Sequence, residues 1–259
     1  MQQFFISDLH LSDKRPDLIR AFVCLTDEIL AKNTPCELYI LGDFFEAYIG
    51  DDYQPEWILT LDNQLKQLTE AGITTYFIAG NRDFLVGQEW FDRTGIIELN
   101  EQHLLAHNES QLVLTHGDEF CVDDKAYQEF RAMVRQPAWQ QQVLGMPLEQ
   151  RVALAQKLRD DSKTMSADKS QDIMDVNQQA IVQTVSKGTH LLIHGHTHRP
   201  ALHEDEAVPR LVLGDWDKKI WLAQLSNGRL IQSCIETTEY LAEQTPYSQW
   251  LTEHTFAFN

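Results

Sequence analysis

Several apolar stretches of this chain end in side chains that can bind a metal ion. The clearest is "LLIHGHTH", in which histidines alternate directly after an apolar run. "FFISDLH", "LYILGD", "YFIAGN" and "LVLTH" also end in aspartate, asparagine or histidine. Together these stretches supply seven donors: Asp8, His10, Asp43, Asn81, His116, His196 and His198. Carboxylate, imidazole and amide donors without a thiolate favour manganese, iron or zinc over a structural zinc site built from cysteines.

Seven donors are too many for a single four-coordinate metal that keeps one position open. Two divalent ions about 3.5–4 Å apart that share one carboxylate would use all of them, and such pairs hydrolyse phosphate esters and anhydrides. An aspartate has two oxygens with which to bridge, and we expect Asp43 to be the shared ligand. The predicted chemistry is therefore hydrolysis of a phosphate bond by a metal-activated hydroxide.

The donors can meet only if the apolar runs are strands of one α/β fold. The expected strands span residues 2–7, 37–43, 74–80, 110–118, 189–195, 210–215 and 218–233, the last with a hairpin turn at Asn227-Gly228. Amphipathic helices are expected over residues 15–33, near Pro16, and over residues 54–72, with Gly72 as the stop. Ligands of open α/β sheets bind beyond the carboxyl ends of the strands, which is where the donors lie in the sequence.

Composition and charge limit the classes of protein to which this chain can belong. The chain has 259 residues, 43% of them hydrophobic, which suits one large domain or a domain with an insertion. Its net charge of -18 argues against general nucleic-acid binding, which needs clustered lysine and arginine. Four scattered cysteines and no N-terminal leader predict a reduced cytosolic protein. Because no apolar run approaches the roughly 18–20 residues that cross a bilayer, any membrane contact should be peripheral.

The order of the motifs carries a resemblance. D-x-H, G-D, G-N-R-D, H-G-D and G-H-x-H follow one another between residues 4 and 216, each after an expected strand. One motif alone is a trivial match, but the ordered set resembles the calcineurin-like metallophosphoesterase superfamily. "GDFFEAYIGDD", "GNRDFL" and "IMDVNQ" are similar, more closely, to the family of UDP-2,3-diacylglucosamine pyrophosphatases of the lipid A pathway. The implied fold is α/β, a four-layer sandwich of two mixed β-sheets flanked by helices, with a helical cap insertion.

The resemblance also implies roles for individual residues and two Mn²⁺ ions as the cofactor. The first metal would take Asp8, His10, Asp43 and His198, and the second Asp43, Asn81, His116 and His196. The implied catalytic residues are Asp43, Asn81, Arg82 and His116. The implied substrate contacts are Asn81, Arg82, Asp124, Ser162, Ser166, Lys169 and His196.

Arg82 is a departure from the wider superfamily, where many members have a histidine that protonates the leaving group. Arginine cannot act as an acid near neutral pH, but its planar fork matches a phosphate. A diphosphate needs no such acid, because the departing phosphate monoester is a good leaving group. The sequence "GNRD" therefore favours a pyrophosphate substrate over a simple alkyl ester.

The spacing of the donors predicts an insertion. Asp8, Asp43, Asn81 and His116 follow one another at intervals of 35, 38 and 35 residues, whereas His196 comes 80 residues after His116. One crossover unit needs only about 30 residues. We therefore expect a core of residues 1–122 and 188–236, a helical cap of residues 123–187, and a tail of residues 237–259 that is a packed arm or a frayed end. Nine basic against seven acidic residues between positions 125 and 187 could receive an anionic amphiphile.

Eight apolar residues of the expected cap have two interpretations: Trp139, Val143, Leu144, Met146, Leu148, Val152, Leu154 and Leu158. Apolar stripes on helices usually pack against one another, so these residues could form the core of the cap itself. The resemblance favours a pocket for acyl chains. His194, which precedes the G-H-x-H motif, is expected to pack beside the site and not to bind metal.

The expected reaction is hydrolysis of UDP-2,3-diacylglucosamine to UMP and 2,3-diacylglucosamine 1-phosphate. The expected location is the cytoplasmic face of the inner membrane, with peripheral membrane contact, no nucleic acid and no obligate protein partner. Two alternatives stay open. One is another nucleotide pyrophosphatase or a cyclic-nucleotide phosphodiesterase of the same superfamily, and the other is a non-catalytic scaffold.

Overall fold

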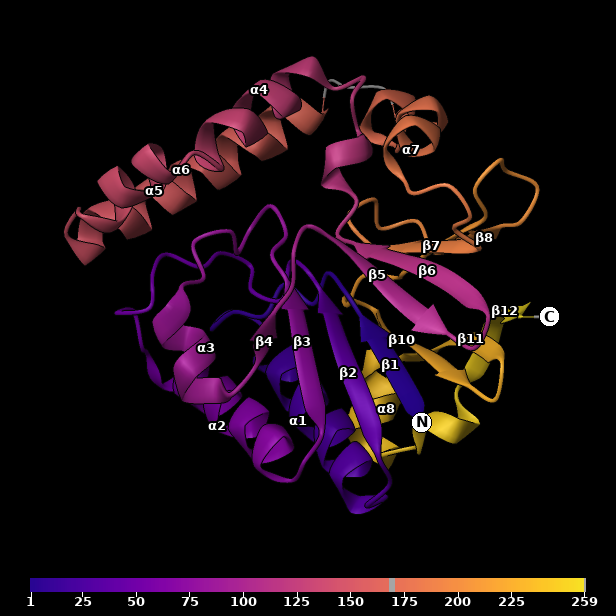
Figure 1. The fold of residues 1–259 in the computed structure, drawn as a ribbon. Helices are drawn as coiled ribbons and strands as arrows, with labels where there is room; N and C mark the ends of the chain where they lie inside the picture. Colours follow the sequence, from indigo (N-terminus) through magenta and orange to yellow (C-terminus); the bar gives the residue numbers. More distant parts are fainter. Residues whose placement is uncertain (168–170, 259) are drawn as a thin grey trace.

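Two β-sheets lie face to face in the computed structural model, which describes residues 1–167 and 171–258 (Figure 1). The first sheet has the order β12-β11-β10-β1-β2-β3-β4, and the second β5-β6-β7-β9-β8. The strands of the first are β1 (Gln2–Ile6), β2 (Cys36–Leu41), β3 (Thr74–Ile78), β4 (Ile97–Glu98), β10 (Lys219–Ser226), β11 (Arg229–Glu236) and β12 (Leu251–Ala257). Those of the second are β5 (Gln102–His107), β6 (Ser110–Thr115), β7 (Leu191–His194), β8 (Ala201–His203) and β9 (Arg210–Val212).

Both sheets are mixed. In the first, β1 to β4 run parallel, and β10, β11 and β12 are added through antiparallel pairs. In the second, β6, β7 and β9 are parallel, with β5 and β8 antiparallel at the edges. Parallel strands have their carboxyl ends at the same edge of a sheet. A donor motif follows β1, β2 and β3 at this edge of the first sheet, and β6 and β7 at this edge of the second.

The alternation of apolar side chains along the strands separates four layers. Phe5 of β1 joins the core between the two sheets, whereas Phe4 and Ile6 face the helices on the outside. The first sheet is covered by α1 (Pro16–Ala31), α2 (Glu56–Glu70), α3 (Gln88–Thr94) and α8 (Thr237–Glu243). The second is covered by α7 (Gln178–Thr184), whose Ile181 packs with Leu192 of β7. The predicted four-layer sandwich is confirmed.

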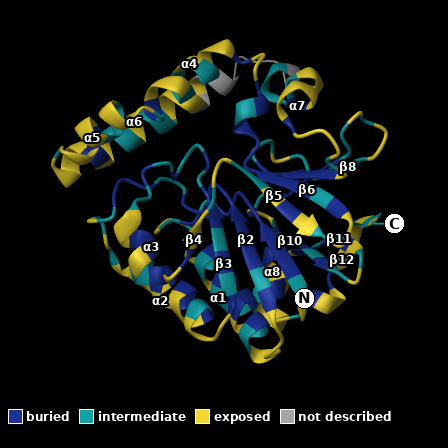
Figure 2. Cartoon of the chain, viewed as in Figure 1, coloured by how far each residue is buried: buried dark blue, intermediate teal, exposed yellow. Residues whose placement is uncertain are grey.

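The cap consists of α4 (Lys125–Val134), α5 (Pro137–Leu144) and α6 (Leu148–Ala167), and it lies beyond the carboxyl ends of β1, β2 and β3 (Figure 1). Its outer surface is largely exposed, in contrast to the strands below it (Figure 2). α7 falls within the expected cap of residues 123–187, but its buried side chain Ile181 packs on the second sheet. Short 3₁₀ helices span Asp118–Phe120, Gln171–Met174 and Tyr247–Gln249.

Proline, glycine and asparagine mark helix ends and a hairpin turn in the structure where the sequence predicts them. α1 begins at Pro16, and α2 ends shortly before Gly72, whose φ of 83° is in the left-handed region. Asn227 and Gly228 both have positive φ and connect β10 to β11 in a tight hairpin. The tail is not a frayed end, because β12 pairs with β11 and extends the first sheet. Within the described residues, no helix combines the length and apolar character needed to cross a bilayer.

Candidate metal centre and the cavity beside it

Three of the expected metal donors meet where β1 and β7 end. Nε2 of His198 lies 3.3 Å from Oδ1 of Asp8 and 3.1 Å from Nε2 of His10. Nε2 of His10 lies 3.9 Å from the same aspartate oxygen. Oδ1 of Asp8 and the Nε2 atoms of His10 and His198 therefore lie close enough together to bind a single ion.

A second group of donors lies directly beside the first. Nε2 of His116 is 3.0 Å from Oδ1 of Asn81 and 3.6 Å from Oδ1 of Asp43, and Nδ1 of His196 is 2.8 Å from the same Asn81 oxygen. Donor atoms of Asp8, Asp43 and His116 all lie within 4.8 Å of one another. The structure thus brings all seven expected donors together, with the two aspartates adjacent where the groups meet.

The backbone at the strand ends is unusual in the same places. Five of the seven donors have positive φ: Asp8 (55°), His10 (49°), Asp43 (50°), His196 (66°) and His198 (54°). Residues other than glycine rarely adopt this region, and such strained positions cluster at functional sites. The extended backbone therefore ends at the donors themselves, where Asp8, His10 and His198 face one another.

Asp8 is held tightly through one of its two carboxylate oxygens. Oδ2 accepts hydrogen bonds from the hydroxyl of Ser7 (2.6 Å) and from the backbone N–H of His196 (2.9 Å). A Cβ at Gly195 would lie 2.1 Å from this oxygen, so only glycine fits there. Oδ1 is buried and has no hydrogen-bond partner among the described residues. Since buried acceptors are nearly always satisfied, an unpaired carboxylate oxygen that faces imidazole nitrogens fits a cation.

The outward-facing nitrogens of three histidines lie near oxygen atoms. Nδ1 of His10 lies 3.5 Å from Oε2 of Glu46 without forming a hydrogen bond, and Nδ1 of His198 lies 3.5 Å from Oδ2 of Asp215. Nδ1 of His116 lies 2.9 Å from the carbonyl oxygen of Leu41. Each ring therefore turns Nε2 towards the other donors, the arrangement that fixes the tautomer of metal-binding histidines.

Glu46 and Asp215 were both missed from the sequence. Asp215 directly follows the apolar run "RLVLG", so the rule that found the seven donors applies to it as well. Glu46 gives a weaker signal, since it lies three residues after Asp43 in a loop that also contains two phenylalanines.

Burial and neighbouring charges together set the protonation of this cluster. Burial raises the pKa of Asp43 to about 7, against the opposing effect of His116 and Arg82. Burial disfavours the charged form of His116, but Asp43 and Asp8 outweigh it and raise the pKa of His116 to about 9. Burial, and then the charge of His116, lower the pKa of His196 to about 4, which leaves its imidazole neutral near pH 7. A neutral imidazole is the form that binds a metal.

Asp83 joins the loops that carry the second group. Its carboxylate is fully buried and accepts hydrogen bonds from the backbone N–H groups of Gly80 (2.7 Å), Phe44 (2.7 Å) and Asp43 (3.3 Å). These donors belong to the loops after β2 and β3, so one side chain sets the relative position of Asp43 and Asn81.

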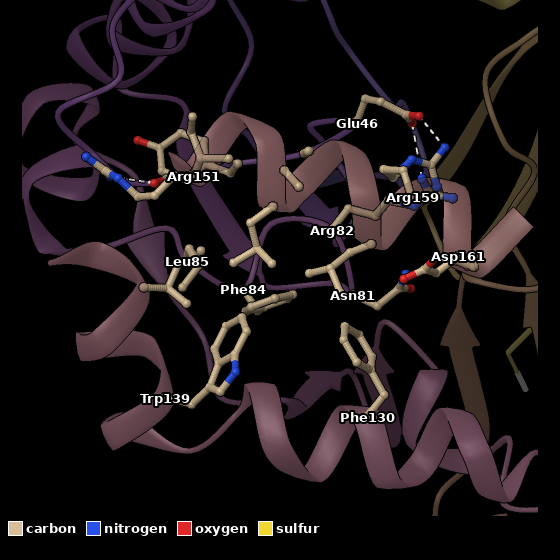
Figure 3. A pocket seen from close by; sticks show the side chains of 18 of the residues that line it. Glu46, Asn81, Arg82, Phe84, Leu85, Phe130, Trp139, Arg151, Arg159 and Asp161 are labelled. Atoms are coloured by element: carbon tan, nitrogen blue, oxygen red, sulfur yellow. Dashed lines mark hydrogen bonds and ion pairs between the residues drawn. The ribbon is translucent and has the colours of Figure 1, made fainter. Parts of the chain in front are cut away.

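Arg82 extends from the metal centre into a cavity of about 300 Å³ between the cap and the core (Figure 3). Its backbone N–H donates to Oδ1 of Asp43 (2.9 Å), its Nε lies 3.3 Å from Oδ2 of Asp43, and its Nη1 donates to Glu46 (3.3 Å). Asn81 and Arg82 lie at one end of the cavity, and Leu85 and Trp139 lie towards the other end, where Arg151 also lines the wall (Figure 3).

Half of the apolar cap residues singled out from the sequence line this cavity. They are Trp139, Val143, Leu154 and Leu158, joined by Phe84, Leu85 and Phe130. Leu144, Leu148 and Val152 are instead exposed, and Met146 does not line the cavity. The eight residues therefore form neither a cap core nor a pocket lining as a complete set. α5 and α6 turn one face to the cavity and another to the surface.

The expected substrate contacts are distributed unevenly. Asp124 and Ser162 line the cavity, and Asp124 also accepts from the backbone N–H of Tyr127 (3.1 Å) as the N-cap of α4. Lys169 and the side chain of Ser166 lie outside the described residues. His194 is fully buried, belongs to neither donor group, and has a pKa lowered to about 3 by burial.

Comparison with known proteins places this geometry in a family. Residues 1–200 match the model of the calcineurin-like phosphoesterases. A protein of Haemophilus ducreyi named UDP-2,3-diacylglucosamine hydrolase is 45% identical over 219 residues, which cover 83% of this chain and 92% of the relative. Proteins with the same name from Haemophilus influenzae (44%; 83% and 90% covered) and Marinobacter nauticus (40%; 88% and 95% covered) are similar over comparable lengths.

Replacing Asp83 tests whether its carboxylate organises the two loops. In Asp83→Asn, an amide NH₂ would face backbone N–H groups that now donate to an oxygen, so we expect a loss of about 1–3 kcal/mol in the free energy of unfolding. Urea unfolding followed by circular dichroism measures it, with Asp92→Asn on the exposed side of α3 as the control. Equal stability of the two variants would contradict this role of Asp83.

Proposed function

This chain is a member of the calcineurin-like phosphoesterase family and, within it, of the UDP-2,3-diacylglucosamine hydrolases, and we propose that it cleaves the diphosphate of UDP-2,3-diacylglucosamine. The products are UMP and 2,3-diacylglucosamine 1-phosphate, an intermediate of lipid A synthesis. One observation carries the proposal. Asn81 and Arg82 of the metal centre line a cavity whose wall also carries apolar side chains such as Trp139, Val143 and Leu154, so a phosphate and acyl chains of one molecule can be bound together.

The seven donors suit two divalent ions, and we assign them as two half-sites. The first half-site is Asp8, His10 and His198, the second is Asn81, His116 and His196, and Asp43 is shared. When bound, the ions supply an activated water and neutralise charge on the phosphate. The oxygen and nitrogen donors suit manganese, iron or zinc, and we choose Mn²⁺ because of the resemblance to the lipid A pathway pyrophosphatases.

In this proposal Arg82 and Asn81 contact the phosphate oxygens that do not leave, and the guanidinium fork of Arg82 suits two of these oxygens at once. His116 acts on the phosphate through the ion that it would hold, because its Nε2 faces the other donors and its Nδ1 lies against the carbonyl oxygen of Leu41. Because arginine does not act as an acid in proteins, the leaving group receives no proton from this position. A departing phosphate monoester requires none, which is the reason why a diphosphate suits this site.

The cap receives the lipid. In this proposal the acyl chains occupy the space lined by Trp139, Val143, Leu154 and Leu158, while Asp124, Ser162, Ser166, Lys169 and His196 contact the sugar and its substituents. The corner between α5 and α6 exposes Leu144 (41%), Leu148 (37%) and Val152 (47%). We assign this corner to peripheral contact with the cytoplasmic face of the inner membrane, from which the substrate would enter the cavity.

The substrate and the point of attack can be tested in one experiment. Purified protein is incubated with UDP-2,3-diacylglucosamine in ¹⁸O-water, with and without Mn²⁺, and the products are analysed by mass spectrometry. We expect Mn²⁺-dependent turnover with the label in UMP, and at most slow cleavage of UDP-N-acetylglucosamine, which lacks acyl chains. Absence of turnover in protein that holds two metal ions per chain, or equal rates on both substrates, would contradict the lipid assignment.

Arg82→Lys tests the role of the guanidinium fork. Lysine keeps the charge and the backbone N–H contact with Asp43 but loses the bidentate geometry. We expect kcat/KM to fall by about ten- to a hundredfold, as for the loss of one or two charged hydrogen bonds, while Mn²⁺ stoichiometry stays unchanged. Arg20→Lys on the exposed face of α1 is the matched control. A kcat/KM equal to that of the control would exclude a bidentate contact with the phosphate.

A further inference from the structure

Glu46 contacts three parts of the molecule that the proposed reaction has to bring together. Its carboxylate lies 3.5 Å from Nδ1 of the metal donor His10 and accepts a hydrogen bond from Nη1 of Arg82 (3.3 Å). It also forms an ion pair with Arg159 of α6 (Figure 3). One side chain therefore contacts a metal donor, the phosphate-binding arginine and the cap.

The backbone of Glu46 is fixed to the core. Its N–H donates to the carbonyl oxygen of Leu11 (3.0 Å), and Leu11 and Phe45 form a β-bridge that joins the loops after β1 and β2. These two loops carry His10 and Asp43. The carboxylate thus projects from the framework of the metal centre towards α6, and its position cannot change freely with the cap.

α6 has a second arginine anchor that provides a natural comparison. Arg151 is buried, and its Nη1 donates to the carbonyl oxygen of Ile49 (2.6 Å) and to Oδ1 of Asp52 (2.7 Å). Both anchors are arginine–carboxylate pairs between α6 and the loop after β2. Only the Arg159 anchor ends on a carboxylate that also contacts the metal centre.

We infer that Glu46 is a positioning residue that couples the docking of α6 to the arrangement of His10 and Arg82. The inference rests on the proposed function, since it assigns Glu46 to the same metal and phosphate site. With α6 docked, Arg159 shares the carboxylate with Arg82 and holds it between the two cations, next to His10. When the pair with Arg159 is broken, the carboxylate loses its contact with that arginine and is held less firmly beside the ring of His10 and the fork of Arg82. Cap closure and site geometry then change together.

The test compares Glu46→Gln with Asp52→Asn in the full-length protein. Each variant removes one charge from one anchor of α6 and keeps the size of the side chain. We expect hydrogen exchange of α6 amides to rise about tenfold in both. Mn²⁺ affinity, measured by calorimetry, should weaken about tenfold or more only in Glu46→Gln, as is usual when a residue that orients a metal ligand is changed. Asp52→Asn should bind Mn²⁺ within about twofold of the wild type.

Kinetics with the lipid substrate separate positioning from simple loosening of the cap. For Glu46→Gln we expect a lower kcat as well as a higher KM, and for Asp52→Asn a higher KM alone. Arg159→Gln should reproduce part of the loss of Mn²⁺ affinity, and the double variant Glu46→Gln/Arg159→Gln should lose less than the sum of the single variants.

Two results would overturn the inference in different ways. A wild type that binds Mn²⁺ while Glu46→Gln binds it equally well, or additive effects in the double variant, would overturn the coupling alone. A wild type that binds no divalent metal would overturn both the coupling and the proposed function.

Discussion

The structure depends on one constraint: donors from five separate segments of the chain must meet within a few ångströms. Strands of two sheets supply them at their carboxyl ends. Left-handed backbone at Asp8, His10, Asp43, His196 and His198 ends the extended strands at the donors themselves. The contacts of Asp83 and the absence of a side chain at Gly195 then hold the turns in place, so the strain is balanced by buried hydrogen bonds.

The cap gives the same centre a second type of surface. Without α4, α5 and α6, the donors and Arg82 would form a polar site open to any phosphate ester. The cavity between cap and core adds Trp139 and the apolar faces of α5 and α6 to that site. Specificity in this account therefore comes from the cap, whereas the phosphate chemistry comes from the strand ends. Glu46, which contacts both, is where the two parts of the function can be coupled.

The strands and the grouping of the seven donor residues at their ends could be predicted because their signals are local, whereas the four-layer arrangement followed only from the resemblance of the ordered motifs. A strand reads as an apolar run, and the residue that follows it is visible in the sequence. Contacts that depend on which loops meet could not be predicted. Glu46 approaches His10 only because the loops after β1 and β2 are joined at Leu11 and Phe45. Edge strands were missed for a related reason: β5 exposes Leu104 and β12 exposes Leu251, so neither shows the apolar run of a buried strand. Likewise, the pattern of α7 predicts a helix without indicating which face of the fold it covers.

The central claim is that two ions lie side by side between the two groups of donors. Anomalous diffraction from crystals grown with Mn²⁺ tests it most directly, because it locates the metal independently of any activity. The account predicts two peaks about 3.5–4 Å apart, one against Asp8, His10 and His198 and the other against Asn81, His116 and His196, with Asp43 in contact with both. A single peak in fully loaded crystals, or two ions without a shared carboxylate, would contradict it.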